Sequence, residues 1–190
     1  MLLVSSELIL VSSLPAVFNV STPKFAAMAI RRVAEMGWHP TQFLNNVSTT
    51  VGSVMIPAGL KNGTGIISAH YLKDPFDPQF DKDPAVTDWR AFMKEFNPQA
   101  NPLDFANVVG YNAAQVLVHV LRQCGNDLTR DNVMRQATSL RAQTFPMLLP
   151  GITITTSPTD YYPISQFQLM RFTGERWEHF GDVLNAKSGT

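Results

Sequence analysis

The chain has 190 residues, of which 45% are hydrophobic, and its 15 Lys and Arg balance its 15 Asp and Glu. This length and composition are sufficient for a buried core in one or two domains. Because nucleic-acid binding requires a basic excess or stripe, the zero net charge predicts no nucleic-acid partner. The single cysteine, Cys124, cannot form an intrachain disulfide. No apolar run reaches the length of a membrane-spanning helix, about 18 residues.

Residues 1–14, MLLVSSELILVSSL, resemble a secretion signal only superficially. The basic first region of such signals is absent, and Glu7 interrupts the apolar segment. The segment is either an extra strand or a leader unrelated to the fold. We favour the leader and expect the folded part to begin near residue 15.

Residues 15–50 predict a strand, a helix and a second strand. The first strand covers residues 16–18, and Ser21 and Thr22 stand where a hydroxyl caps a helix that begins near Pro23. The second strand covers residues 41–44. Such a crossover implies a parallel sheet with ligand sites at the carboxyl ends of its strands. The helix should end at a Gly37 cap, with a buried stripe at helical spacing formed by Phe25, Met28, Ala29, Val33 and Met36.

The next segment predicts a short helix within 51–60 before Pro57, a turn at 62–65 and a third strand at 66–72. Closely spaced prolines and aspartates at 73–78 then favour an extended, helix-free crossing, as a hinge requires.

Three helices follow without strands between them. The first covers about 85–97, the longest about 103–124, and the third follows a Thr129 cap. Their spacing predicts inward faces formed by Ala85, Trp89, Phe92, Met93 and Phe96 in the first and by Val109, Ala113, Val116, Leu117, Val120, Leu121 and Cys124 in the second.

The end of the chain predicts a strand at 151–155 and a β-hairpin formed by 164–172 and 176–184. The fold class is therefore α/β, but the helices in the middle lack a sheet of their own on which to pack. The chain consequently looks like part of a larger structure.

Five segments together resemble the carboxyl-terminal half of a branched-chain-amino-acid-type substrate-binding protein of ABC transporters. The resemblance covers roughly residues 15–185 and is specific because the segments occur in the family's order. They are STPKFAAMAIRRVAEMGW, VGSVMIPAGLKNGTGIISAHYLKDPFDP, DWRAFMKEF, VVGYNAAQVLVHVLRQCGNDLTRDNVMRQATSL and LLPGITITTSPTDYYPISQFQLMRFTGERWEHFGDVL.

The resemblance implies a partial type I periplasmic-binding-protein fold, with parts of two Rossmann-like lobes, hinge crossings and a C-terminal β-hairpin. Residues 15–72 would belong to the second lobe, 73–148 to the first lobe and 149–190 to the hinge return and last strands, whereas 1–14 do not match. The resemblance also implies periplasmic localisation, binding of a small-molecule solute without chemistry or cofactor, and contact with the membrane subunits of an ABC permease. A ligand-sensing domain of a receptor or regulator uses the same fold and stays open as an alternative; an α/β hydrolase or amidase is the third.

The resemblance places the solute at the strand ends of the second lobe. Candidate contacts are Ser21 and Thr22 after the first strand, Asn45, Asn46, Val47 and Ser48 after the second, and His70 and Tyr71 at the end of the third. Family members that bind amino acids carry an aromatic residue at the first place and a carboxylate at the second. This chain has neither there, and a buried ammonium group without an anion costs several kcal/mol. The residues therefore favour a neutral, amide-like or aromatic acid solute.

Each candidate also has a structural explanation. Ser21 and Thr22 can cap the helix, the residues from Asn45 to Ser48 can form a turn, and His70 and Tyr71 can pack at a strand end. Tyr161 and Tyr162 are expected at the surface or in hinge packing.

Catalytic and metal sites are not predicted. The histidines His39, His70, His119 and His179 lie in different elements, without HExxH or CxxC spacing, and no GxSxG, GxxxxGK[ST] or GxGxxG motif occurs. His119 is expected to be a hydrogen-bonded core residue. If the first half of the fold is missing, the helices at 85–97 and 103–124 should expose apolar faces, which predicts self-association or complementation by a missing N-terminal half.

Overall fold

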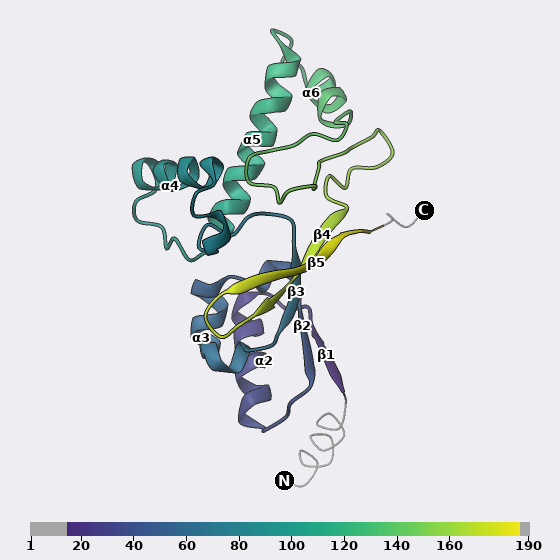
Figure 1. The fold of residues 1–190 in the computed structure, drawn as a ribbon. Coiled ribbons are helices and arrows are strands. Elements are labelled where there is room, and N and C mark those ends of the chain that lie inside the picture. Colours follow the sequence, from purple (N-terminus) through teal and green to yellow (C-terminus); the bar gives the residue numbers. More distant parts are fainter. Residues whose placement is uncertain (1–14, 187–190) are drawn as a thin grey trace. The chain divides into compact units, whose positions relative to one another are not determined.

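The computed structural model describes residues 15–186, which divide into two compact units (Figure 1). Among these residues, unit 1 holds 15–69, 101–105 and 169–180, and unit 2 holds 70–100, 106–168 and 181–186. The chain passes between the units within three strands, β3, β4 and β5, and on either side of 101–105. The predicted leader, residues 1–14, lies outside the described residues.

Unit 1 contains the predicted crossover of strand, helix and strand. Strand β1 (Ala16–Asn19), helix α2 (Pro23–Glu35) and strand β2 (Thr41–Leu44) follow one another, and the two strands pair in parallel (Figure 1). Strand β3 (Ile67–His70) pairs in parallel with β2. Gly37, with φ +62°, follows the helix as predicted, because this left-handed conformation suits glycine. The predicted parallel sheet is therefore confirmed.

The predicted C-terminal hairpin completes the sheet, whose order is β1-β2-β3-β4-β5. It consists of β4 (Gln166–Phe172) and β5 (Trp177–Asn185). The Phe172 N–H donates to the Ile66 carbonyl beside β3, with 2.9 Å between nitrogen and oxygen. Side chains from this hairpin share one buried cluster with α2 and the following turns, formed by Ala26, Ala27, Ile30, Leu44, Val54, Met55, Ala58, Ile66, Met170, Phe172 and Trp177.

Helix α2 turns a different side toward this core than its sequence pattern predicted. Ala26, Ala27 and Ile30 are buried, whereas Phe25 and Met28 of the predicted stripe are 60% and 57% exposed. The helix therefore carries two apolar sides, and this unit covers only one of them.

The segment after β2 also differs from its prediction. A π-helical turn (Val51–Met55) continues directly into the short helix α3 (Ile56–Ala58), and a 3-10 turn (Leu60–Gly63) follows. Pro57 does not end the helix, because it lies in the first turn of α3, where a missing N–H costs nothing. The third strand is also shorter than the predicted 66–72.

Unit 2 contains the three predicted helices, α4 (Pro84–Phe96), α5 (Ala106–Cys124) and α6 (Arg130–Ala137). The Thr129 side chain accepts a hydrogen bond from the Asn132 N–H, which confirms the predicted cap. Helix α5 starts three residues later than predicted. Residues 151–155 form no strand; Ile154 makes only an isolated antiparallel bridge with Gln143. None of the helices in residues 15–186 is both long and apolar enough to cross a membrane.

The predicted inward faces of α4 and α5 are only partly buried. Trp89 and Met93 of α4 and Val120 and Cys124 of α5 are buried. Other members of the predicted faces are exposed, namely Phe92, Phe96, Val109, Ala113, Leu117 and Leu121. The expectation that both helices expose apolar residues is therefore confirmed for this chain.

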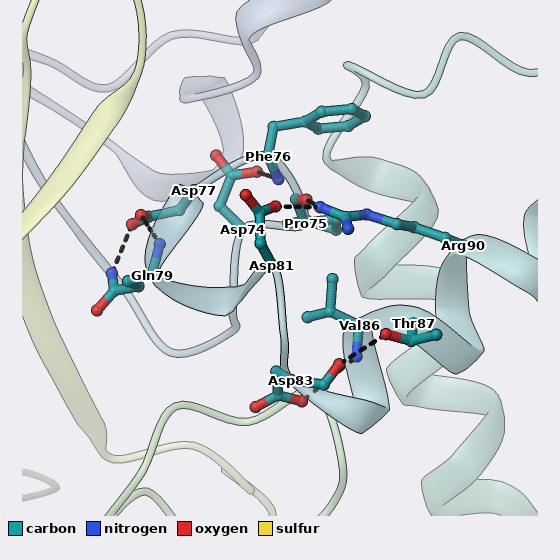
Figure 2. Close-up of polar contacts among 10 residues, drawn as sticks. All are labelled: Asp74, Pro75, Phe76, Asp77, Gln79, Asp81, Asp83, Val86, Thr87 and Arg90. Carbon is teal, nitrogen blue, oxygen red and sulfur yellow. Dashed lines mark hydrogen bonds and ion pairs between the residues drawn. The ribbon is translucent and has the colours of Figure 1, made fainter.

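An acidic segment leads from β3 into α4 (Figure 2). The Asp77 side chain accepts from the Gln79 N–H and caps a 3-10 turn (Pro78–Phe80). Figure 2 shows the Arg90 guanidinium facing the Pro75 carbonyl and the Asp81 carboxylate, to which it lies at 2.9 Å. These contacts tie the segment to α4.

Asp83 combines two roles at the start of α4. Its carboxylate accepts from the N–H groups of Ala85 and Val86 as the helix cap, and it forms an ion pair of 2.7 Å with the buried Lys73. Desolvation alone would raise the pKa of Asp83, but the hydrogen bond and charge of Lys73 and the two backbone N–H groups lower it below its usual value. By contrast, desolvation raises the pKa of Asp74, the Phe76 N–H opposes the rise, and Asp77 adds to it.

We predict that Asp83→Asn makes the free energy of unfolding less dependent on pH in the acidic range. A lowered carboxyl pKa adds stability above the pKa of the unfolded chain, and this contribution disappears as pH falls through the folded value. Asparagine still caps a helix, so the substitution removes mainly the charge. Urea unfolding should show a loss of up to about 1 kcal/mol at pH 7 and a much smaller loss at about pH 3.

The control is Asp88→Asn, the same substitution at an exposed position of α4. It should change the free energy of unfolding little at either pH. An Asp83→Asn effect of equal size at both pH values would contradict the account.

Candidate functional site

The carboxyl ends of β1 and β2 meet at one corner of unit 1, because Asn19 and Leu44 are register partners. The Asn45 N–H donates to the Asn19 carbonyl at 3.0 Å. The Ser48 hydroxyl donates to the Ser21 carbonyl at 2.6 Å. We call this group, residues 19–22 and 45–48, the strand-end corner. The structure therefore brings together the two sets of polar residues that the sequence predicted after β1 and β2.

Thr22 stands at the N-cap of α2, but its side chain makes no capping hydrogen bond, so this part of the cap prediction is wrong. The Ser21 hydroxyl instead donates to the Asn19 side-chain oxygen. The first-turn N–H groups of a helix have no partner within the helix, and Pro23 contributes no N–H. The helix start thus presents the positive end of its dipole at the strand-end corner.

Asn45 contributes a buried acceptor. Its side-chain oxygen is shielded from solvent, yet it has no hydrogen-bond partner among residues 15–186. A buried amide oxygen without a donor is costly, commonly 1–3 kcal/mol. An unpaired acceptor at the end of a parallel strand marks this corner as a candidate binding site.

The remaining residues of the second loop divide into two kinds. Asn46 begins a 3-10 turn (Asn46–Ser48), and its carbonyl accepts from the Thr49 hydroxyl at 2.8 Å. Val47 is largely exposed, whereas Ser48 is fully buried. The backbone therefore forms the predicted turn. The Ser48 hydroxyl connects this turn to the first loop through its hydrogen bond to the Ser21 carbonyl.

His70 and Tyr71 belong to unit 2, and their place in the same site stays a prediction. The buried His70 ring accepts from the N–H groups of Tyr71 and Leu72 at 3.0 and 3.2 Å through Nδ1. Tyr71 packs against His70 and meets Phe167 edge to face. Burial raises the pKa of the Tyr71 hydroxyl above its usual value. These contacts agree with the alternative interpretation, in which His70 and Tyr71 pack at the end of a strand.

Sequence reasoning missed three supports of the corner. The Trp177 indole N–H donates to the buried Thr49 carbonyl at 2.6 Å, across 128 positions of sequence. The Thr50 hydroxyl donates to the Leu103 carbonyl and lies 3.4 Å from an Asp104 carboxylate oxygen. Trp177, Leu103 and Asp104 are all remote in sequence from Thr49 and Thr50, so no local pattern could indicate them. Asn19 could have been found, because a short polar side chain two residues before a serine often hydrogen-bonds that backbone.

Other candidates lie apart from the corner. No group of three or more His, Cys, Asp or Glu side chains within the described part of the chain could hold a metal ion. His119 is only half-buried, so the core prediction is wrong, although its ring does contact the Gln123 amide at 2.8 Å. Tyr161 and Tyr162 are exposed, as predicted.

Comparison with known proteins identifies the family. The sequence pattern of the family described as periplasmic binding protein matches residues 9–176, which includes the last residues of the predicted leader. The chain therefore belongs to the periplasmic binding protein family. No curated protein matches the chain in sequence.

Solved structures show the same fold. A branched-chain amino acid ABC transporter protein from Thermus thermophilus with bound valine is 12% identical, with a TM-score of 0.78 over 96% of this chain and 49% of its own. A substrate-binding periplasmic protein from Ralstonia solanacearum is 20% identical, with a TM-score of 0.76 over 94% of this chain and 49% of its own. A solute-binding protein from R. palustris in complex with benzoate is 19% identical, with a TM-score of 0.65 over 99% of this chain and 49% of its own.

These comparisons confirm the predicted type I periplasmic-binding-protein fold and its partial nature. The chain spans about half the length of these structures. The family and these structures are substrate-binding proteins and not enzymes, in agreement with the prediction from sequence.

We predict that Ser48→Ala loosens the strand-end corner. The substitution removes the hydroxyl of the fully buried Ser48, which donates to the half-buried Ser21 carbonyl. Urea unfolding should show a loss of about 0.5–1.5 kcal/mol. Ser53→Ala, at an exposed hydroxyl of the same segment, should lose less than about 0.5 kcal/mol. Equal effects of the two variants would contradict the role of Ser48.

Proposed function

We propose that this chain is the solute-binding component of an ABC importer, that it holds a small solute at the strand-end corner, and that it delivers the solute to a membrane permease in the periplasm. The observation that carries the proposal is the buried Asn45 oxygen without a donor, beside the start of α2, at the carboxyl ends of two parallel strands. Family membership supports the class of function.

The chemistry of the corner supports a particular kind of solute. The dipole at the start of α2 and the hydroxyls of Ser21 and Thr22 suit a carboxylate or another anionic or strongly polar group. The Asn45 oxygen lacks a donor among residues 15–186 and therefore suits a solute group that can donate, such as an amide N–H. Residues 19–22 and 45–48 include no carboxylate, so an ammonium group would be buried there without a counter-charge. We therefore propose an amide, which can donate to the Asn45 oxygen, or an aromatic acid, whose carboxylate suits the start of α2 but offers Asn45 no donor.

Asp104 is the acidic side chain that could supply a counter-charge for an ammonium group near the corner. It lies near Thr50, two residues beyond the strand-end corner, and not within it. Its contact with the Thr50 hydroxyl gives this carboxylate a structural partner already. The absence of a carboxylate at the strand ends therefore still disfavours a zwitterionic amino acid, and valine is the direct comparison.

We also propose that residues of the other lobe line the solute site. The predicted division assigns residues 15–72 to the second lobe, 73–148 to the first and 149–190 to the hinge return, and unit 1 and unit 2 are candidates for these lobes. Solute binding would then favour a closed arrangement in which His70 and Tyr71 also line the site. Such closure requires a solute affinity that is higher in the closed state.

We predict that benzoate or benzamide raises the melting temperature of the chain more than valine does at the same concentration. A solute that binds only the folded chain stabilises it by about 2.7 kcal/mol at a hundredfold excess over its dissociation constant. Chromatography of the recovered solute should show it unchanged. Equal stabilisation by valine would overturn the proposed solute class, and no stabilisation by any of the three would count against the site.

Asn45→Asp tests the position of the solute. It replaces the amide with a carboxylate, so the affinity for benzoate should fall at least about tenfold through charge repulsion, while valine should gain. Asn97→Asp introduces the same charge at an exposed position after α4 and should leave both affinities unchanged. Calorimetric titration distinguishes these results, and equal behaviour of the two variants would contradict the placement at Asn45.

A further inference from the structure

A hollow in unit 1 lies at the opposite end of α2 from the strand-end corner. It encloses about 380 Å³, which is sufficient for a small organic molecule. Its lining comes from the last turn of α2, from residues 38–40 before β2, from Gln42 of β2 itself, and from residues 61, 62 and 64 before β3. All of these residues belong to unit 1. We call this hollow the helix-end pocket.

The fixed charge at the helix-end pocket is positive. Among the described residues that line it, Lys61 carries this charge and none is acidic. The ion pairs formed within residues 15–186 involve other cations, so Lys61 has no counter-charge among them. The carboxylate of Glu35, on the last turn of α2, is already paired with Arg32 at 3.3 Å. A bound anion would therefore supply the missing counter-charge.

The end of α2 does not oppose an anion through free carbonyl groups. The carbonyl of Ala34 accepts from the Gly37 N–H at 3.0 Å, and the carbonyl of Val33 accepts from the Trp38 N–H at 3.2 Å. These two bonds satisfy carbonyls that would otherwise project the negative end of the helix dipole. The attraction of Lys61 for an anion is therefore weakly opposed.

The rest of the lining suits an organic anion better than an inorganic one. Val33 and Pro40 are apolar, and the indole of Trp38, which is only 8% exposed, supplies an aromatic wall. His39 and Gln42 add groups that can form hydrogen bonds. An inorganic ion uses only the polar part of such a lining, whereas a carboxylate on a ring or a short chain uses both parts.

The turn that carries Lys61 is held in place by the fold. The Asn62 side chain donates to the Ala58 carbonyl at 2.7 Å. Gly63 is buried, and a Cβ at this position would lie 3.1 Å from the Phe172 ring, so the turn packs tightly against the core of unit 1. A site that is already ordered loses less conformational freedom when a ligand binds.

We propose that the helix-end pocket binds a small organic carboxylate. Lys61 pairs with the carboxylate, and Trp38, Val33 and Pro40 contact the apolar body of the ligand. This site is separate from the strand-end corner and goes beyond the proposed function, because it requires neither closure of two lobes nor a permease.

The direct experiment titrates benzoate into the isotope-labelled chain and follows each backbone amide and the Trp38 indole N–H by nuclear magnetic resonance. We expect saturable shifts on residues 38–42 and 61–64 and on the Trp38 indole, with a dissociation constant of their own. Benzamide has the same shape without the charge and should bind this pocket about fivefold more weakly. Inorganic phosphate should cause no saturable shift of the Trp38 indole.

Lys61→Met removes the charge and keeps most of the side-chain length. It should weaken benzoate binding at the helix-end pocket about fivefold and leave the shifts at the strand-end corner unchanged. Lys61→Arg should retain most of the affinity. Lys94→Met is the matched control, at an exposed lysine of α4 that does not line the pocket, and should change nothing. Because Lys61 is itself exposed, the melting temperature of each variant should stay the same.

Four outcomes would overturn the inference. They are no saturable shift at the helix-end pocket, equal affinity for benzamide, equal effects of Lys61→Met and Lys94→Met, and equal affinity for phosphate, which would leave an adventitious ion only.

Asn45→Asp distinguishes this inference from the proposed function. It should alter the benzoate shifts at the strand-end corner and not those at the helix-end pocket. Saturation at the pocket alone contradicts the proposed function, and saturation at the corner alone contradicts this inference.

Discussion

The parallel pairing of β1 with β2 is the constraint on which the rest of unit 1 depends. A parallel pair needs a crossover, and α2 supplies it, so both strands end at the same edge of the sheet. This arrangement places Ser21 beside Ser48, whose hydroxyl fastens the two strand ends together. Trp177 then holds the following turn from the far end of the chain through the Thr49 carbonyl. The candidate site is a consequence of this topology.

The sequence was informative where the signal is local. Pro23 and Gly37 bound α2, Thr129 caps α6, and the run around Gly174 forms the turn of the C-terminal hairpin, where φ is +99°. These residues act through their own backbone conformation, so neighbours a few positions away are sufficient to predict the structure. The polar residues after β1 and β2 were also predictable, because strand ends in parallel sheets meet.

The sequence failed where burial depends on distant parts of the fold. Phe25, Phe96 and Leu117 follow helical spacing and predict buried faces, yet all three are exposed in this chain. Periodicity shows that a face is apolar, but it cannot show whether the covering element is present. Trp177 and Asp104 were missed for a related reason, since their contacts with Thr49 and Thr50 span long stretches of sequence. The exposed apolar faces agree with the half-length match to solved relatives, because both indicate that this chain is part of a larger fold.

The account depends most on the solute occupying the strand-end corner, and amide chemical shifts test this directly. Benzoate is titrated into the isotope-labelled chain, and the shift of each backbone amide is followed by nuclear magnetic resonance. We predict that the largest shifts fall on residues 21–25 and 45–48, at the start of α2 and the end of β2. Saturable shifts located only elsewhere, or no saturable shifts with benzoate, benzamide or valine, would contradict the central claim.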